Sequence, residues 1–370
     1  MKKSSKIIFL TGTRAEYGLM KPTLIELQKN FKVKLIVTGT HLLKKYGYSV
    51  QEIYNDKFEI SSKIKISPKS NDLKNMADTV GLLIPKITSI LKKEMPDLVL
   101  IEGDRGEQLS MAIAASFMNI PIAHTSGGYR SKTIDDLTRN AITKFSNLHL
   151  APSKASAQRI KNMNEESWRI HVVGPPINLN FKKIDILKKL KIQSKEPILL
   201  LIQHPVSNQY DQSRTQIKTT LSAITSLKYN TIIIYPNSDA GSKEIIEEIE
   251  KIRNLPYIHI FKNLKNNDFM NLMSCADLMI GNSSAGIVEA PFFKLPVINL
   301  GIRQQNRECG DNVLNSNHNL YEIKKKIGIG LNKNFRKNLK YNPYKLHKPS
   351  EKLISKILLN IKIDQKFISK

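Results

Sequence analysis

The sequence predicts two tandem α/β domains whose parallel sheets face a central cleft. Short apolar runs alternate with segments of helical composition along most of the 370 residues, the pattern of repeated β-α-β units. Such units require parallel strands, since the chain crosses back over the sheet between them. The length suits two cores of ordinary size. Small polar turns follow several apolar runs, and open α/β sheets bind ligands at the carboxyl ends of their strands.

The first domain is expected to span residues 1–180. The polar segment Asp56–Asn71 is either an edge strand or a mobile loop. A helix over Leu73–Lys93 is expected to kink or break at Pro85, whose backbone has no N–H to donate. Gly174 and the two prolines after it mark the end of the domain. The predicted strands, each short, apolar and bounded by turn residues, are Lys6–Thr11, Val33–Thr38, Leu98–Glu102, Pro121–Thr125, Asn147–Pro152 and Arg169–Val173.

The second domain is expected over residues 181–345, beginning with a lysine-rich connector at Lys182–Glu196. Residues 346–370 are expected to form a C-terminal helix that packs back on the body, because apolar residues from Leu353 to Ile361 recur at helical spacing. The predicted strands of the second domain are Pro197–Gln203, Thr231–Tyr235, Tyr257–Phe261, Ala276–Ile280 and Leu295–Leu300, and its predicted helices are Ser242–Arg253, Asn267–Met273 and Ala285–Phe293.

The charge balance argues against a polynucleotide partner. The chain has 58 Lys and Arg against 32 Asp and Glu, a formal net charge of +26, which by itself is typical of proteins that bind nucleic acid or membranes. Only 11 of the basic residues are Arg, the better phosphate ligand, and the lysines are scattered without interleaved aromatic residues. A lysine-rich surface and a small anionic substrate explain the charge better. A peripheral attraction to anionic membrane stays open.

The sequence shows no sign of membrane insertion, secretion or a metal site. The longest apolar run, Ile198–Ile202, is far shorter than a membrane span, and the N-terminal apolar run is too short for a secretory signal. The two cysteines, Cys275 and Cys309, fit no disulfide framework and no metal-ligand spacing, and they suit a reducing cytosol. We expect a cytoplasmic protein that works without a metal or cofactor.

A candidate anion site follows the fourth predicted strand of the second domain. Ser283 and Ser284 provide hydroxyl donors beside the unpaired N–H groups of the next helix, whose positive dipole end favours anions. Glu289, about one and a half turns on, is placed to reach the ribose of a bound nucleoside diphosphate. Arg303 and Arg307 follow the next strand at the same sheet edge. The alternative is a serine-capped helix with a solvated glutamate.

Charged residues also follow predicted strands of the first domain. Arg14 lies in the turn GTRAEYG after the first strand, and Asp104 and Arg105 come directly after a buried strand. An adjacent acid and base at a strand end can have a tuned pKa, although an Asp there also serves as a helix N-cap. Asp135 and Asp136 begin a later helix. Two carboxylates there are stabilised by the positive end of the helix dipole whatever the function of the protein.

His204 follows the strand Pro197–Gln203 and is expected to face the cleft. A histidine at such an edge is most often structural, but its pKa range suits either phosphate binding or proton delivery to a leaving group. The histidines within predicted strands have spacings unrelated to a metal site; they are His124, His149, His171 and His259.

Several of these segments resemble the hydrolysing UDP-N-acetylglucosamine 2-epimerases of sialic-acid-type sugar pathways. The resemblance rests on GNSSAGIVEAP followed by VINLGIRQQNRECGDNVL, on the opening GTRAEYG, on GDR after a buried strand, on TIDDLTRNAITK, and on the His-Pro pair at His204. It covers about residues 6–320. It implies a GT-B fold, in which two Rossmann-like domains enclose a cleft.

The resemblance implies roles for the second-domain candidates. The two serines of GNSSAG, here Ser283 and Ser284, hold the diphosphate in that family, and the glutamate, here Glu289, holds the ribose. The arginine after the next strand, here Arg303, contacts the phosphates. The His-Pro pair carries a substrate-contact role over to His204.

The resemblance also implies roles in the first domain. The arginine of the opening motif, here Arg14, is assigned to the substrate's phosphates, and the aspartate of GDR, here Asp104, to the C2 proton of the sugar. Arg105 matches the same motif. The family's further catalytic acid falls on Asp135 or Asp136.

One motif departs from the family's pattern. The family usually has H-I-E-G-G-E, and this chain has Ser126 and Tyr129 in place of the two glutamates. The first of those glutamates is commonly given an acid/base role, which a serine at its ordinary pKa cannot fill. The departure leaves the second proton transfer unassigned.

The implied reaction is hydrolysis of UDP-N-acetylglucosamine with inversion at C2, through a glycal, to N-acetylmannosamine and UDP for nonulosonic (sialic-type) acid biosynthesis. The nucleotide sugar is the expected partner, and homodimers or homotetramers are common in the family. Alternatives are a hydrolysing enzyme for GDP-N-acetylglucosamine or a UDP-diacetamido sugar, a non-hydrolysing epimerase, and a GT-B glycosyltransferase. A peripheral membrane protein would need a clustered lysine face, which the sequence does not show.

Overall fold

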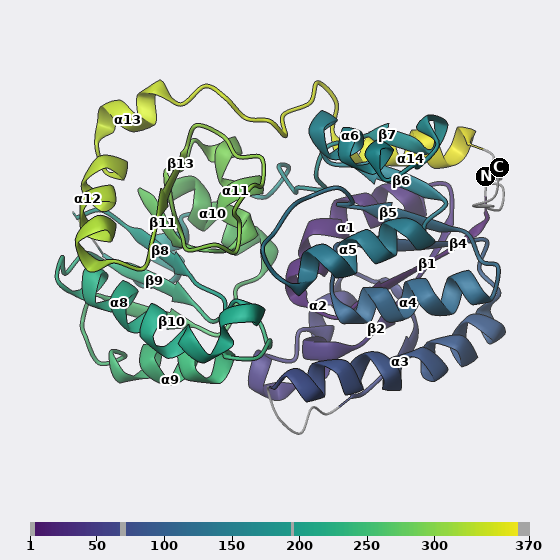
Figure 1. Ribbon diagram of the computed structural model, residues 1–370, viewed down its shortest axis with the longest axis horizontal. Helices are drawn as coiled ribbons and strands as arrows, with labels where there is room; N and C mark the ends of the chain where they lie inside the picture. Colours follow the sequence, from purple (N-terminus) through teal and green to yellow (C-terminus); the bar gives the residue numbers. More distant parts are fainter. Residues whose placement is uncertain (1–3, 67–71, 194–195, 362–370) are drawn as a thin grey trace.

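The chain folds into two α/β lobes that lie side by side (Figure 1). The computed structural model describes residues 4–66, 72–193 and 196–361. The end of the expected segment Asp56–Asn71, part of the connector Lys182–Glu196 and the end of the expected C-terminal segment lie outside the described residues. The domain limits near residues 180 and 345 stay predictions.

The first lobe holds a seven-stranded, fully parallel sheet in the order β3-β2-β1-β4-β5-β6-β7. The central strand β4 is buried along its full length, as a two-sided core requires. Two alternatives were predicted for Asp56–Asn71, an edge strand or a mobile loop. The described part of this segment contains β3, which is an edge strand of the sheet. The strands are β1 Lys6–Thr11, β2 Lys32–Val37, β3 Glu59–Lys63, β4 Leu98–Glu102, β5 Ile122–Thr125, β6 Leu148–Ala151 and β7 Ile170–Val172.

The second lobe holds a six-stranded parallel sheet in the order β10-β9-β8-β11-β12-β13. Two parallel α/β sheets confirm the fold class expected from the sequence. Edge strand β13 was not predicted, because only its first two residues are apolar. The strands are β8 Leu199–Ile202, β9 Thr231–Ile234, β10 Ile258–Phe261, β11 Leu278–Gly281, β12 Val297–Leu300 and β13 Val313–Ser316.

Helices cover both faces of each sheet because successive strand residues point to opposite sides. In β1, Ile7 and Phe9 enter one core cluster, and Ile8 and Leu10 enter another. The helices are α1 Arg14–Gln28, α2 Val50–Asn55, α3 Leu73–Glu94, α4 Gly106–Phe117, α5 Ile134–Phe145, α6 Lys154–Asn162, α7 Ile186–Lys189, α8 Ser213–Thr225, α9 Ser242–Lys251, α10 Asn266–Cys275, α11 Ser284–Val288, α12 Leu320–Gly330, α13 Lys333–Asn338 and α14 Ser350–Asn360.

Two helix predictions need correction, and both involve proline. Helix α3 runs unbroken past Pro85, which is exposed, so water can satisfy the carbonyl that loses its N–H partner. The expected helix Ala285–Phe293 is instead the five-residue α11 followed by a 3-10 turn over Ala290–Phe293. Pro291 cannot donate the N–H that would continue an α-helix.

Helix α14 belongs spatially to the first lobe, although it follows the second in sequence (Figure 1). It packs on α1, with Ile354 and Leu358 fully buried in the core cluster of the first sheet. At the start of α14, the Ser350 hydroxyl donates a hydrogen bond of 3.1 Å to the Gly174 carbonyl. The last helix therefore ties the two lobes together.

Each sheet reverses its strand order at one point, between β1 and β4 in the first and between β8 and β11 in the second. Loops diverge at such a switch point and leave a crevice at the carboxyl ends of the strands. Strand β11 approaches β8 closely, since a Cβ on Gly281 (φ 130°) would lie 1.9 Å from the Ile202 carbonyl oxygen. The loops after these four strands carry most of the predicted site residues.

Candidate active site

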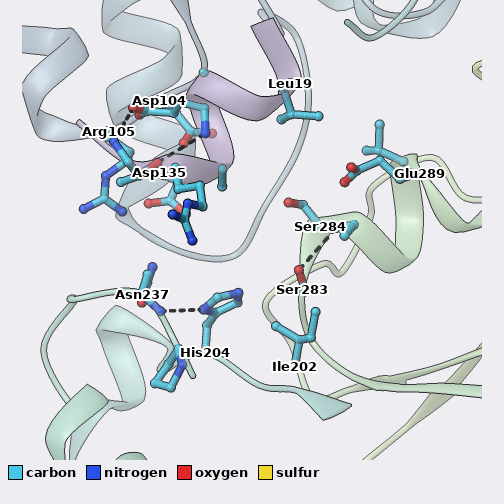
Figure 2. A pocket seen from close by; sticks show the side chains of 18 of the residues that line it. Leu19, Asp104, Arg105, Asp135, Ile202, His204, Asn237, Ser283, Ser284 and Glu289 are labelled. Carbon is cyan, nitrogen blue, oxygen red and sulfur yellow. Dashed lines mark hydrogen bonds between the residues drawn. The ribbon is translucent and has the colours of Figure 1, made fainter. Parts of the chain in front are cut away.

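A cavity of about 370 Å³ lies between the carboxyl ends of the two sheets. Figure 2 shows Asp104 and Asp135 of the first domain on the opposite side of this space from Ser284 and Glu289 of the second. The cavity therefore brings together side chains far apart in sequence. It is lined by every predicted site residue except Asp136, namely Arg14, Asp104, Arg105, Asp135, His204, Ser283, Ser284, Glu289, Arg303 and Arg307.

Asp104 is held by Arg139, a residue that the sequence analysis did not single out. The Arg139 Nη2 donates to Asp104 Oδ2, and Arg139 is only 1% exposed. Burial opposes ionisation of Asp104, but Arg139, Arg307 and Arg303 outweigh burial and lower its pKa. Asp104 is therefore a fixed negative charge in the cavity.

The structure separates the two adjacent carboxylates of α5. Asp136 accepts hydrogen bonds of 3.0 Å from Arg139 Nη1 and from the Ser131 backbone N–H, outside the residues that line the cavity. Asp135 lines the cavity, and burial together with the charge of Asp104 raises its pKa to about 6. Asp136 thus positions Arg139, and Asp135 is the carboxylate that a substrate can reach.

The residues predicted to bind phosphate lie at the start of α11 and in the loop after β12. Ser283 is the N-cap of α11 and accepts from the Ala285 N–H at 3.3 Å. Arg303 donates to the Asn282 carbonyl at 3.1 Å, and its Nη2 lies 3.5 Å from Asp135. Because α11 has only five residues, its dipole is weaker than that of the longer helix predicted, and the serine hydroxyls and Arg303 are further donors that line the cavity here.

Glu289 lies between α11 and the following 3-10 turn, at 7% exposure, on the second-domain side of the cavity. Burial raises its pKa to about 7, although Arg307 opposes the shift. A half-protonated carboxyl can both donate and accept, which suits the two hydroxyls of a ribose.

His204 is a neutral imidazole in this setting. Its Nδ1 accepts a 3.0 Å hydrogen bond from the Asn237 backbone N–H (Figure 2), so the ring proton lies on Nε2. Burial, with Arg303 and Arg105 nearby, lowers its pKa well below the ordinary value. Of the two roles considered for it, donation of a hydrogen bond to an anion fits better than delivery of a proton as imidazolium.

The two other predicted arginines bridge the domains. The Arg14 Nη1 donates to Asn263 of the second domain, and its Nε lies 3.1 Å from Glu52. The Arg105 Nη2 lies 3.4 Å from Asp239 of the second domain. Both guanidinium groups line the cavity but already have carboxylate partners, so a phosphate would compete with these carboxylates.

The positions of Ser126 and Tyr129 have their own contacts. Ser126 adopts the left-handed conformation (φ 62°), which costs a non-glycine residue about 1 kcal/mol, and its hydroxyl donates to Glu102 at 2.7 Å. The Tyr129 ring carries the Arg307 guanidinium 3.9 Å from its centroid, and Tyr344 packs edge-on against it. An aromatic ring thus orients Arg307 at this position.

Sequence reasoning missed Glu102 and Arg139 as site residues. Glu102 is the last residue of β4 and had been counted as strand, and Arg139 is buried inside α5. Only the i, i+3 spacing from Asp136 could have indicated a partner for Arg139.

In the described ranges no helix is long and apolar enough to cross a bilayer.

Comparisons with known proteins identify the family. The UDP-N-acetylglucosamine 2-epimerase family matches residues 24–358. The chain is 38% identical over 317 residues to the UDP-N,N'-diacetylbacillosamine 2-epimerase (hydrolyzing) of Legionella pneumophila, covering 84% of both chains. It is 33% identical over 326 residues to the GDP/UDP-N,N'-diacetylbacillosamine 2-epimerase (hydrolyzing) of Campylobacter jejuni, covering 85% of both.

Among solved structures, the chain resembles the Methanocaldococcus jannaschii UDP-GlcNAc 2-epimerase in complex with UDP-GlcNAc and UDP. The TM-score is 0.79 at 23% identity, covering 95% of this chain and 99% of that one. This likeness confirms the GT-B fold. With two relatives above 30% identity and a family match over most of its length, the chain belongs to the UDP-N-acetylglucosamine 2-epimerase family.

Proposed function

We propose that the protein is a hydrolysing 2-epimerase of a UDP-linked 2-acetamido sugar, with UDP-N-acetylglucosamine as the first candidate substrate. One observation carries this proposal: a single cavity is lined by two carboxylates of the first domain, Asp104 and Asp135, and by Ser284 and Arg303 of the second. Carboxylates suit proton transfer at the sugar ring, and hydroxyl and guanidinium donors suit a leaving diphosphate.

Asp135 is the stronger candidate for the base that removes the C2 proton. Its pKa of about 6 leaves it ionised at neutral pH and still basic enough to accept a proton. Asp104, which the family resemblance places in that role, has a lowered pKa and is therefore a weaker base. In our proposal Asp104 keeps Asp135 basic through its negative charge and orients Arg139.

The second domain supports departure of the diphosphate. Negative charge develops on the bridging oxygen as the C1–O bond breaks, and Ser284, Arg303 and the Nε2–H of His204 line the space where it would lie. These donors are held in place by the protein before substrate binds, so they stabilise that charge without reorganisation. Glu289 binds the ribose in this proposal.

The chemistry balances as an elimination followed by hydration. The C2–H electron pair becomes the C1=C2 bond as UDP leaves, and the proton goes to Asp135. Water then adds through its oxygen to C1 of the glycal, and a proton adds to C2. Because the configuration at C2 inverts, that proton must reach the opposite face of the ring, and so it comes from a different group.

A second candidate substrate is a UDP-linked diacetamido sugar. It is favoured by the names of the relatives from L. pneumophila and C. jejuni, both described as hydrolysing diacetylbacillosamine 2-epimerases. The second of these names also includes the GDP sugar. The epimer released from UDP-N-acetylglucosamine would be N-acetylmannosamine, a precursor for nonulosonic (sialic-type) acid biosynthesis.

Nuclear magnetic resonance of the reaction mixture tests the proposal. The protein is incubated separately with UDP-N-acetylglucosamine, GDP-N-acetylglucosamine and UDP-diacetamido sugar, and free nucleotide and free 2-epimer are followed. Equal amounts of both products are expected with at least one UDP sugar. An epimer still attached to nucleotide would indicate a non-hydrolysing enzyme. An absence of turnover unless an acceptor is added would indicate a glycosyltransferase.

A further inference from the structure

A further carboxyl group of the first domain lines the cavity, at a position that the sequence predicted as the end of strand β4. Glu102 is the last residue of β4, is 5% exposed and lines the cavity together with Asp104 and Ser126. In the register of the sheet it pairs with Thr125 of β5. Its side chain therefore lies beside the segment where the family usually carries a glutamate and this chain has Ser126.

Hydroxyl groups hold Glu102 in place. The Ser126 hydroxyl donates to Oε1 at 2.7 Å, and the Thr125 hydroxyl contacts Oε2. The Thr125 oxygen also lies 3.1 Å from the Ile101 carbonyl, a second acceptor. One hydroxyl proton cannot serve two acceptors well, whereas a protonated Glu102 can donate to the Thr125 oxygen and leave the Thr125 proton for the carbonyl.

The electrostatic surroundings favour the same protonation state. Burial raises the pKa of Glu102, and the charge of Asp104 adds to the rise, although Thr125, Ser126 and Arg307 oppose it. Asp104 stays ionised because of its guanidinium neighbours. The cavity thus places a carboxyl with a raised pKa close to an ionised one, the kind of pair in which acid and base roles are divided.

We propose that Glu102 is the catalytic acid that returns a proton to C2, in place of the glutamate that Ser126 replaces. This inference rests on the proposed function. The carboxyl on β4 reaches the place where a longer side chain at residue 126 would lie, and Ser126 orients it. Asp136 does not line the cavity, and His204 has its proton on Nε2 with a low pKa, so neither fits this step as well as Glu102.

The step balances without a further reactant. The Glu102 O–H bond breaks as the C2–H bond forms from the C1=C2 electron pair. The oxygen of water bonds to C1, and the proton that the water loses passes to the Glu102 carboxylate. Glu102 is therefore restored in each turnover, while the proton taken by Asp135 leaves to solvent.

The test separates the two halves of the reaction in the full-length protein. With UDP-N-acetylglucosamine or whichever UDP sugar the wild type converts, E102Q is expected to reduce epimer formation about 100-fold more than UDP release. The glycal should accumulate, as seen by NMR. The double variant E102Q/S126E, which moves the carboxyl to residue 126, is expected to recover at least about 10-fold of the lost epimer formation.

Two controls support the interpretation. E248Q changes a glutamate that is 4% exposed and lies outside the cavity, and it should change neither half of the reaction. Thermal denaturation and UDP affinity show whether each variant folds. If E102Q does not fold, E102D decides: glycal accumulation supports the inference, and a wild-type ratio of epimer to UDP contradicts it.

Other results would overturn the assignment. Wild-type turnover in E102Q, or an equal loss of UDP release and epimer formation in a folded E102Q that still binds UDP, would exclude Glu102 as the C2 acid. A wild-type protein that releases neither UDP nor epimer from any of the sugars would instead refute the proposed function itself.

Discussion

Arg303 Nη2 of the second domain lies 3.5 Å from Asp135 Oδ2 of the first. The cation proposed to bind the diphosphate therefore partly neutralises the carboxylate proposed to take the proton. Arg303 lowers the pKa of Asp135, against burial and Asp104, which raise it to about 6. A diphosphate would attract Arg303 and add its own negative charge, so substrate binding should make Asp135 more basic.

This relationship predicts a pH effect. A base must be ionised, so activity should fall as pH drops through the pKa of Asp135. The acid limb of kcat/KM should lie near pH 6, and that of kcat, which reports the complex, at higher pH. D135N should lower kcat about 100-fold or more and abolish the limb. Limbs that coincide, or a limb that persists in D135N, would contradict the assignment.

The second prediction concerns Asp104 and its partner Arg139. D104N removes the negative charge that raises the pKa of Asp135, so turnover should fall about 10-fold or more while UDP affinity stays within about threefold. Isothermal titration with UDP and a turnover assay measure the two quantities. D136N serves as the comparison, since Asp136 lies outside the cavity and should affect turnover less. Undiminished turnover in D104N would remove Asp104 from the mechanism.

The third prediction concerns the phosphate donors. Ser284→Ala together with Arg303→Ala should weaken UDP binding at least about 100-fold, since each hydrogen bond to a charged group contributes about 1.5–3 kcal/mol. Isothermal titration checks this. Ser283→Ala should chiefly lower stability, by about 1 kcal/mol, because Ser283 caps α11. Unchanged UDP affinity in the double variant would place the phosphate site elsewhere.

The fourth prediction separates ribose from phosphate binding. Glu289 is buried at the cavity wall, so E289A should weaken UDP binding about 10-fold by loss of ribose hydrogen bonds. Inorganic pyrophosphate has no ribose, and its affinity should not fall. Competition against UDP measures both. A parallel loss for the two ligands would show that Glu289 acts on the phosphate region instead.

The fifth prediction concerns the return of α14 to the first lobe. Leu358 is fully buried in the core around α1, so L358A should lower the free energy of unfolding by about 2–5 kcal/mol. Thermal and urea denaturation measure the change. K356A, on the exposed face of the same helix, should be within about 0.5 kcal/mol of wild type. Equal stability of L358A and wild type would show that α14 contributes little to this core.

Much of the fold could be predicted because hydrophobic period and turn residues are local signals. Strands β1 and β4 match the predicted bounds, and α3 begins at Leu73 as expected. The prolines were less informative. Pro85 did not break α3, because it is exposed and water can replace the lost hydrogen bond. Pro291 is buried, where water cannot replace that bond, and the helix after Ser284 ends before it.

The sequence alone was sufficient to assign two parallel α/β domains, a family resemblance and ten residues that the structure places around one cavity. These assignments follow from strand-end position, because parallel strands deliver their following loops to one edge. The tertiary structure decided three further points: that Asp135 rather than Asp136 lines the cavity, that Arg139 holds Asp104, and that Glu102 reaches Ser126. Each of these points depends on the rotation of a helix about its axis or on the register between neighbouring strands. Both are set by packing between segments far apart in the sequence, so the order of residues alone does not give them.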